Sequence, residues 1–376
     1  MALAKTEAIW ESIKVFEMTS LTSYSCHAPA DRSKLASVII CNYNYERFVG
    51  EAISSALNID WPNVEVIVVD DGSTDRSRSI IESFASRGIK MIFQANRGQA
   101  SAAEEGYRIS KGEWVLFLDA DDTVHPSLLR EAKTVMRPGW SSIQFQMRLV
   151  DESGRFLGSV FPKYNKNTTP EKIRKSLATT ASYPTPPTSG NLLSRDFLEQ
   201  IFPLQQNMDR WIDSYFLATA PLLGDVLTVC KPLISYRIHG RNDGAQLTLD
   251  LARIARDLGR HITRTEYGAK VAQKFGVEVA PDRWRYGFYN LAMRIASLRL
   301  AHESHPIHND AVLSCLRDGL VATCSPQGLT PLRHMAMSFW LVSVAVAPKR
   351  IARVLISWRF APMSRPRFVQ RTIQSA

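Results

Sequence analysis

Cysteine is scarce in this chain. The 376 residues include five cysteines, and no two of them form a CxxC pair. The sequence therefore indicates neither a zinc site nor a disulfide framework, and a reducing compartment fits best. The five are Cys26, Cys41, Cys230, Cys315 and Cys324.

Long apolar runs are also missing. The run at 335–348 has about fourteen residues, fewer than the roughly 20 that a bilayer-spanning helix needs. Residues 1–33 carry charged residues within the first turns and have no long apolar core, which excludes a secretory signal. We expect this segment to be a loosely held extension with a short helix near 9–16.

Negative charge is absent from the C-terminal end. Residues 331–376 contain no Asp or Glu but eight basic residues, which supply +8 of the net charge of +10. The remainder is close to neutral, and no basic face with interleaved aromatic residues appears near the acidic motifs, which disfavours nucleic-acid binding. The eight are Arg333, Lys349, Arg350, Arg353, Arg359, Arg365, Arg367 and Arg371.

Two aspartate clusters stand out in an otherwise ordinary globular composition of 45% hydrophobic and 22% charged residues. Asp70-Asp71-Gly72-Ser73 follows the apolar run 64–69, and Asp119-Ala120-Asp121-Asp122 follows 114–118. Short β-branched apolar runs are typical of buried parallel strands. Carboxylates at the ends of such strands line the crevice where α/β proteins bind ligands. This much acid favours a hard cation and a phosphorylated substrate.

Strand and helix patterns alternate through about 85 residues, which predicts an α/β fold with a mostly parallel, doubly wound, Rossmann-like sheet. Beyond Asp122 we expect a looser pattern that includes a helix over 209–223 and short strands at 226–230 and 233–237. The predicted strands are 35–41, 64–69, 89–93 and 113–118, and the predicted helices are 46–57, 73–84 and 98–109.

A helical C-terminal region is predicted by apolar stripes over 249–275, 284–302 and 310–320. The expected organisation has four parts. These are an extension at 1–33, the sheet domain at 34–245, a helical region at 246–330 and a basic amphipathic tail at 331–376.

Five motifs in this order resemble the family 2 inverting glycosyltransferases of the GT-A fold, over about residues 35–242. DDGS or DxD alone would be a weak signal, but five motifs in order, on suitable elements, are a strong one. They are SVIICNYN, VIVVDDGSTD, FLDADD, IDSYFLATAPLLG and PLISYRIHG.

The resemblance implies a nucleotide-sugar site. Asp71 would accept a hydrogen bond from the base, since an ionised carboxylate only accepts. Cys41 and Tyr43 fall where the family contacts the same base, although strand packing alone would also explain Cys41. Asp70 has the alternative of closing the turn.

In the same family the DxD motif holds Mg²⁺ or Mn²⁺ on the donor diphosphate. This implies Asp121 as the metal ligand and Asp119 as a partner of the ribose or of the ligand. We expect Asp122 to cap the helix that starts near Pro126.

Asp213 is the implied catalytic base, because inversion needs a carboxylate that takes the proton of the acceptor hydroxyl. Its distance from Gly224 matches the family, although the usual acidic pair is reduced to Ile212-Asp213. Asp209, expected one helical turn earlier, is the rival, and both acids could instead be surface residues of the helix.

Two further positions are implied to contact phosphate or metal, namely Arg237 and His239, since an Arg fork suits phosphate. Ser189-Gly190-Asn191 matches the start of the family's acceptor site. Glu104 departs from the family, which usually has Asn there, and a carboxylate cannot donate as an amide does.

The sequence thus predicts a metal-dependent, hexosyltransferase-type enzyme that moves a sugar from a nucleotide diphosphate donor to a hydroxyl, in polysaccharide or glycolipid assembly. One alternative is a nucleotide-sugar-binding, membrane-associated protein without catalytic activity. Another is a nucleotidyltransferase, which would want a Gly-rich loop where this chain has Asn42-Tyr43-Asn44-Tyr45.

Residues 349–360 mix cations with large apolar groups, as helices in a membrane interface do. We expect the tail to bind the inner face of the cell membrane peripherally, with the body in the cytoplasm and a carbohydrate or lipid-linked acceptor. The alternative is a helical hairpin packed on the body or on a second copy.

Overall fold

The computed structural model describes residues 34–164, 168–206, 208–239, 249–323 and 331–361. The helix expected near 9–16 and the end of the tail, 362–376, lie outside the described residues.

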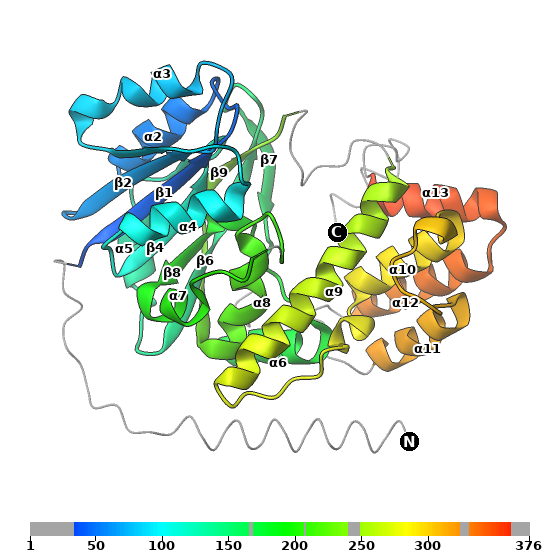
Figure 1. Ribbon diagram of the computed structural model, residues 1–376. Helices are drawn as coiled ribbons and strands as arrows, with labels where there is room; N and C mark the ends of the chain where they lie inside the picture. The colour runs from blue at the N-terminus through cyan, green and yellow to red at the C-terminus, as the bar shows by residue number, and fades with distance from the viewer. Residues whose placement is uncertain (1–33, 165–167, 207, 240–248, 324–330, 362–376) are drawn as a thin grey trace.

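Four parallel strands form one half of a curled sheet, in the order β3-β2-β1-β4 (Figure 1). β1 lies between β2 and β4, with Asn42 opposite Asp70 and Cys41 opposite Asp119. Because the four strands run in one direction, their carboxyl ends meet at one edge, which carries both aspartate clusters. The strands are β1 (Ala36–Asn42), β2 (Val64–Asp70), β3 (Lys90–Phe93) and β4 (Trp114–Asp119).

The other half of the sheet is mixed. β8 runs antiparallel to β4, β6 antiparallel to β8, and β9 parallel to β6, while β5 and β7 pair antiparallel with β9 and β6. The predicted α/β class is confirmed, but only the first four strands form a continuous parallel block, and beyond them the β6–β9 pair alone is parallel among the described strands. The remaining strands are β5 (Thr123–Val124), β6 (Trp140–Val150), β7 (Phe156–Phe161), β8 (Asn191–Ser194) and β9 (Asp225–Arg237).

Helices cover both faces of this sheet (Figure 1). One apolar core packs α2, α3 and α5 against one face, and a second packs α4, α6, α7 and α8 against the other. The helices are α2 (Val49–Leu57), α3 (Ser77–Glu82), α4 (Gln99–Ile109), α5 (Leu128–Lys133), α6 (Pro170–Thr180), α7 (Arg195–Ile201) and α8 (Asp213–Leu223).

Three local predictions differ from the structure. α8 begins at Asp213, so residues 209–212 precede the helix that was predicted from 209. The two short strands predicted at 226–237 are one strand, β9, with irregular register against β6. Asp122 does not cap a helix, because α5 begins at Leu128 and Asp122 instead accepts from the backbone of Arg237.

A predicted helical region follows and is confirmed. Its third core packs α10 against α11, α12 and α13 and against the N-terminal half of α9. These helices are α9 (Leu251–Lys274), α10 (Phe288–Leu300), α11 (Val312–Thr323), α12 (Pro331–Val346) and α13 (Lys349–Phe360).

Helix α9 belongs to two cores and joins the two parts of the molecule (Figure 1). Ile254 and Leu258 lie in the helical core, whereas Tyr267 and Val271 lie in the core under the sheet. At Gly268 the helix touches α8 so closely that a Cβ would come within 2.5 Å of the Ala218 carbonyl oxygen. The carboxylate of Asp250 caps the start of α9 by accepting from the nitrogen of Arg253 at 2.9 Å.

No helix within the described ranges combines the length and the apolar character that crossing a membrane requires.

Candidate active site

A cleft of about 630 Å³ opens at the carboxyl edge of the parallel strands. Its volume is in the range of small-molecule sites. It gathers six of the eight residues that the sequence singled out, and the other two, Arg237 and His239, lie outside its lining. The six are Cys41, Tyr43, Asp71, Asp119, Asp121 and Asp213.

The two acids at the end of β2 have different surroundings. Asp70 closes the turn, accepting from Asn42 Nδ2 at 2.7 Å and from the nitrogen of Ser73 at 2.9 Å. Asp71 is 3% exposed, and its carboxylate accepts from Gln94, from the nitrogen of Arg97 and from the nitrogen of Gly98, at 2.7 to 2.9 Å. These donors fix the orientation of Asp71 at the wall of the cleft.

Cys41 and Tyr43 flank the same wall at the end of β1. Burial, followed by the charges of Asp119 and Asp71, raises the pKa of the Cys41 thiol far above its ordinary value, so this thiol is neutral. The Tyr43 ring is 43% exposed, which leaves a flat aromatic surface at the cleft.

Three carboxylates crowd the end of β4. Asp119, Asp121 and Asp122 each offer an oxygen, and these oxygens lie within 4.8 Å of one another. Burial, then Asp121 and Asp213, raises the pKa of Asp119 well above its usual range, and burial with Asp121 and Asp119 does the same for Asp122. One buried oxygen of Asp122, Oδ2, lacks a hydrogen-bond partner in the described structure. A bound cation would relieve both the repulsion and this missing partner.

Arg237 is buried beside the DxD loop. Its side chain is 3% exposed and donates to the carbonyl oxygens of Asp121 at 3.0 Å and of Glu152 at 2.8 Å, with an ion pair to Glu51. The guanidinium also lies over the Phe48 ring, 4.9 Å from its centroid. These contacts hold Arg237 against the loop that carries Asp121, and its contact with phosphate stays a prediction.

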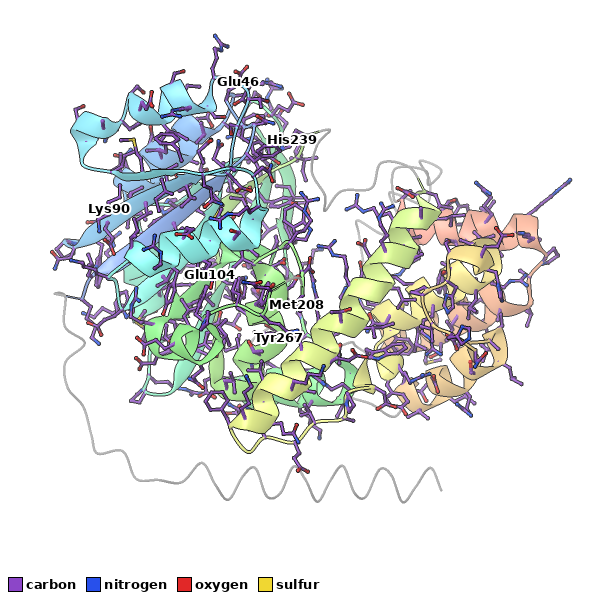
Figure 2. All side chains as sticks on the ribbon, in the orientation of Figure 1. Glu46, Lys90, Glu104, Met208, His239 and Tyr267 are labelled. Carbon is purple, nitrogen blue, oxygen red and sulfur yellow. The ribbon has the colours of Figure 1, made fainter. Side chains whose placement is uncertain are left out.

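His239, labelled in Figure 2, contacts the DxD motif at Asp121. Its Nε2 lies 2.9 Å from Asp121 Oδ2, and its ring stacks on Phe48 at 5.2 Å with Tyr45 against its edge. Since an ionised carboxylate only accepts, Nε2 is the donor. His239 thus orients Asp121, and its contact with phosphate stays a prediction.

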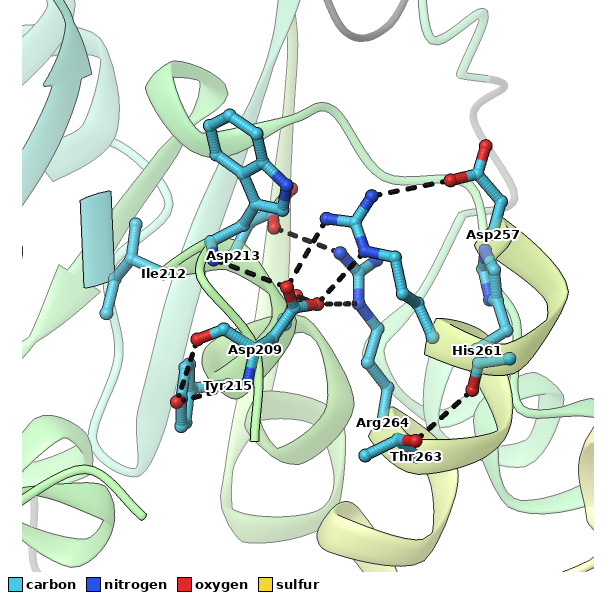
Figure 3. Close-up of polar contacts among 12 residues, drawn as sticks. Asp209, Ile212, Asp213, Tyr215, Asp257, His261, Thr263 and Arg264 are labelled. Atoms are coloured by element: carbon cyan, nitrogen blue, oxygen red, sulfur yellow. Dashed lines mark hydrogen bonds and ion pairs between the residues drawn. The ribbon is translucent and has the colours of Figure 1, made fainter. Parts of the chain in front are cut away.

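Asp213 and Asp209 differ clearly in their environment (Figure 3). Asp209 is 5% exposed at its side chain and takes a hydrogen bond from Ser214 and ion pairs from Arg260 and Arg264. Burial would raise its pKa, but the Ser214 hydrogen bond and then the two arginines outweigh it and lower the pKa. Asp209 lies outside the cleft lining, and we therefore assign it a structural anchoring role.

Asp213 lines the cleft as the first residue of α8. It meets Arg264 at 3.4 Å, and its side chain is 19% exposed. Ile212, which replaces the first acid of the family's usual pair, is fully buried in the core. The missing acid is therefore at a position that packs inward, away from the cleft.

Gln99 is a site residue that the sequence analysis missed. It starts α4, donates from Nε2 to Asp119 at 2.5 Å and accepts from the nitrogen of Ile212 at 3.3 Å. Beside it, the nitrogen of Ala100 donates to the carbonyl of Arg210 at 2.8 Å. These contacts hold the Asp213 segment against the DxD strand. No motif spacing points to Gln99, because its partners are distant in sequence.

Glu104, the departure from the family pattern, has a structural partner (Figure 2). Its carboxylate accepts from the nitrogen of Leu204 at 3.1 Å. An acceptor at this position therefore holds the segment after α7 against α4.

In a comparison with known protein families, residues 37–202 match the family described as Glycosyl transferase family 2. An uncharacterized glycosyltransferase of Nostoc sp. is 35% identical over 217 residues, which are 55% of this chain and 66% of the relative. The uncharacterized glycosyltransferase EpsJ of Bacillus subtilis is 39% identical over 98 residues, which cover 26% of this chain and 28% of EpsJ. The chain thus spans less than two thirds of the length of these relatives.

Among solved structures, TarS of S. aureus in complex with UDP-GlcNAc matches over 85% of this chain and 92% of that chain. The sequence identity is 17% and the TM-score 0.49, which is a distant resemblance.

Proposed function

We propose that this chain, whose residues 37–202 match the family described as Glycosyl transferase family 2, transfers a sugar from a nucleotide diphosphate donor to a hydroxyl acceptor in a metal-dependent, inverting reaction. The single observation that carries the proposal is one cleft in which Asp71, the DxD acids and Asp213 meet.

The nucleoside of the donor would bind between the ends of β1 and β2. Asp71 is held with its carboxylate at the cleft and would accept from a ring N–H of the base. Tyr43 offers an exposed ring for stacking. Cys41, as a neutral thiol, would contribute packing at the floor of this subsite.

The diphosphate would lie at the end of β4, where the crowded acids and the unpartnered Asp122 oxygen fit a hard divalent cation, Mg²⁺ or Mn²⁺. Asp121 would ligate it, Asp119 would lie toward the ribose, and Arg237 and His239 would keep Asp121 oriented. The cation would neutralise the charge of the diphosphate as it leaves.

Asp213 would act as the general base that takes the proton of the acceptor hydroxyl. It lies in the same cleft as Asp119 and near enough to raise the pKa of that acid. Gln99 joins the two segments, so that acceptor and donor subsites keep a fixed separation. Attack from the Asp213 side with departure toward Asp121 inverts the anomeric centre.

Donor binding is the direct test. The full chain is titrated by calorimetry with a panel of nucleotide diphosphate sugars, with and without Mn²⁺, alongside Asp121→Asn. We expect at least one donor to bind, with an affinity that depends on Mn²⁺ in the native chain and is lost in the variant. The control is Asp282→Asn, which changes an exposed acid of the helical region. Absence of heat with every donor, while a related enzyme responds under the same conditions, would refute the proposal.

We also propose that helices α11 to α13 rest on an anionic membrane surface, as the inner face of the cell membrane is. One face of α12 packs on α10, and the other face is open. That side carries a stripe on α12 with 3–4 residue spacing, of which Phe339 is 76% exposed. Exposed apolar residues of the surface are Leu313, Leu320, Leu332, Met335, Phe339, Val342, Val346, Ile351 and Val354.

Charge favours lipid over a second copy of the chain as the occupant. Lys349, Arg350 and Arg353 are exposed beside the stripe, and no acid lies between 331 and 376. Each cation would contribute about 1 kcal/mol near anionic lipid, whereas two such basic faces would repel each other.

Vesicle sedimentation tests this surface. Anionic and neutral vesicles are compared for the native chain and for Met335→Gln/Phe339→Gln, which changes only exposed side chains. We expect binding to anionic vesicles that the variant loses. Equal sedimentation of both proteins would overturn the membrane assignment and favour packing on the body. A dimer in size-exclusion chromatography that the variant dissociates would overturn it and favour a second copy as the occupant.

A further inference from the structure

Helix α9 presents one stripe of charged side chains to the cleft. The residues recur at 3–4 residue intervals and therefore share one face of the helix. Ile254 and Leu258, on another face, are packed in the helical core, which fixes the rotation of the helix. The stripe consists of Arg253, Asp257, Arg260, His261 and Arg264, and all five line the cleft.

Two arginines of the stripe hold the wall together. Arg260 and Arg264 both pair with the buried Asp209, and Arg264 also reaches Asp213 at 3.4 Å (Figure 3). His261 adds no charge, because burial and then the charges of Arg264 and Arg260 lower its pKa to about 3. It is a neutral group between cations at any physiological pH.

Two other arginines keep donor capacity toward the cleft. Arg253 has Asp257 at 3.6 Å, beyond the length of a good hydrogen bond. Arg210, on the segment before α8, lines the same cleft with its guanidinium 4.8 Å from the centre of the Trp211 ring. Within the described ranges, no carboxylate lies at ion-pair distance from Arg210. A planar guanidinium binds a phosphate or a carboxylate through paired N–H groups.

We propose that the acceptor carries an oxyanion, a phosphate or a carboxylate, which binds in the cleft to the guanidinium groups of Arg253 and Arg210. This inference rests on the proposed function, since it places the acceptor hydroxyl at Asp213. Arg264 is the last residue of the stripe and contacts both Asp213 and Asp209. This end of the stripe is therefore where the reacting hydroxyl would lie. The acidic DxD end repels a free oxyanion, whereas the α9 wall attracts it.

Anionic and neutral sugar probes test the subsite directly. Binding of glucose 6-phosphate, glucuronate and glucose is measured by ligand-observed NMR in the presence of EDTA, which removes cation-assisted binding at the DxD motif. We expect the native chain to bind at least one anionic probe roughly tenfold more tightly than glucose, in line with one charge-assisted hydrogen bond.

The variants are Arg253→Gln and Arg210→Gln, and the control is Arg256→Gln. Arg256 is on the same helix, but its side chain is 66% exposed and it does not line the cleft. We expect the first two variants to lose the preference over glucose and the control to keep it. Preference for phosphate alone, carboxylate alone or both supports the proposal and identifies the group.

Equal binding of the three probes to the native chain would overturn the inference, and so would an unchanged preference in both variants. A donor titration with Mn²⁺ on the same samples separates this failure from failure of the proposed function. Donor binding that stays intact in Arg253→Gln while the anionic preference disappears would assign the effect to the acceptor side.

Discussion

Replacing Asp213 with Asn removes the proposed base while changing little else. General-base catalysis contributes about 10²–10⁴-fold, which at 1.36 kcal/mol per factor of ten is about 2.7–5.4 kcal/mol of transition-state stabilisation. We expect kcat to fall by this factor. The proposed donor contacts of Asp71 and Asp121 come from other segments, so donor affinity should stay within about twofold of the native value.

The structure also bounds the cost in stability. The Asp213–Arg264 pair is long, at 3.4 Å, and both side chains are about one-fifth exposed, so its loss costs about 0–1 kcal/mol. The charge at the start of α8 contributes about 0.3–1 kcal/mol more. Asp213→Asn should therefore remain folded, and its loss of activity would reflect chemistry.

The assay measures initial rates at saturating donor, together with a calorimetric donor titration and a denaturation curve. Asp209→Asn is the matched comparison, because this buried acid anchors Ser214 and two arginines. We expect it to lose stability, about 3–5 kcal/mol, before it loses specific chemistry. Activity of Asp213→Asn within tenfold of the native chain would refute its role as the base.

Three further predictions concern the supporting structure. Arg237→Ala should weaken Mn²⁺-dependent donor binding by about 10–100-fold, because it releases the loop that carries Asp121; unchanged calorimetric affinity would contradict this. For Asp310, burial would raise the pKa, but hydrogen bonds from His305, Arg294 and Ser314 outweigh it and hold the pKa far below its usual range. The stabilisation by ionised Asp310 is present above its unfolded pKa near 3.9 and is lost as pH falls. Asp310→Asn should therefore lower the free energy of unfolding by about 3–5 kcal/mol at pH 7 and by less at pH 3. Denaturant titrations at both pH values measure this, and equal unfolding midpoints for the native chain and the variant at pH 7 would be the contrary result. Gly268→Ala should lower stability by about 1–3 kcal/mol by overpacking α9 against α8. Gly259→Ala on the same helix should be neutral or stabilising, because the nearest atom to its added Cβ would be 3.7 Å away. Similar melting temperatures for the two variants would contradict the close packing at Gly268.

The sequence predicted the parts of the fold whose signals are local. The short apolar runs of β1, β2 and β4 and the apolar stripe of α9 lie where the sequence pattern indicated. β8 has four residues and α7 seven, too few for a periodic pattern to show. The mixed half of the sheet depends on pairing between distant segments, which no local pattern encodes.

The candidate site divides in the same way. Asp71 and Asp121 follow strands directly, so their meeting at one edge was predictable from parallel pairing. Arg237 was expected to bind phosphate because its chemistry suits it, whereas its buried contacts with the DxD loop and with Glu51 could not be read from the sequence. Gln99 is polar, next to a glycine and otherwise unremarkable in sequence; only the approach of Ile212, 113 residues away, gives it a role.

Helix α9 packs in two apolar cores, and its packing residues are separate from the residues that line the cleft. One end of the cleft, where we propose that the nucleotide binds, is built from strand ends, whereas another wall is formed by α9, which lies outside the sheet. An α9 helix taken from another chain could bring new side chains into the cleft. If it retains Gly268 and the apolar residues Ile254 and Leu258, the packing of the helix would stay unchanged. Under the proposed function, exchanging this one helix would change the acceptor side of the cleft and leave the proposed donor side as it is.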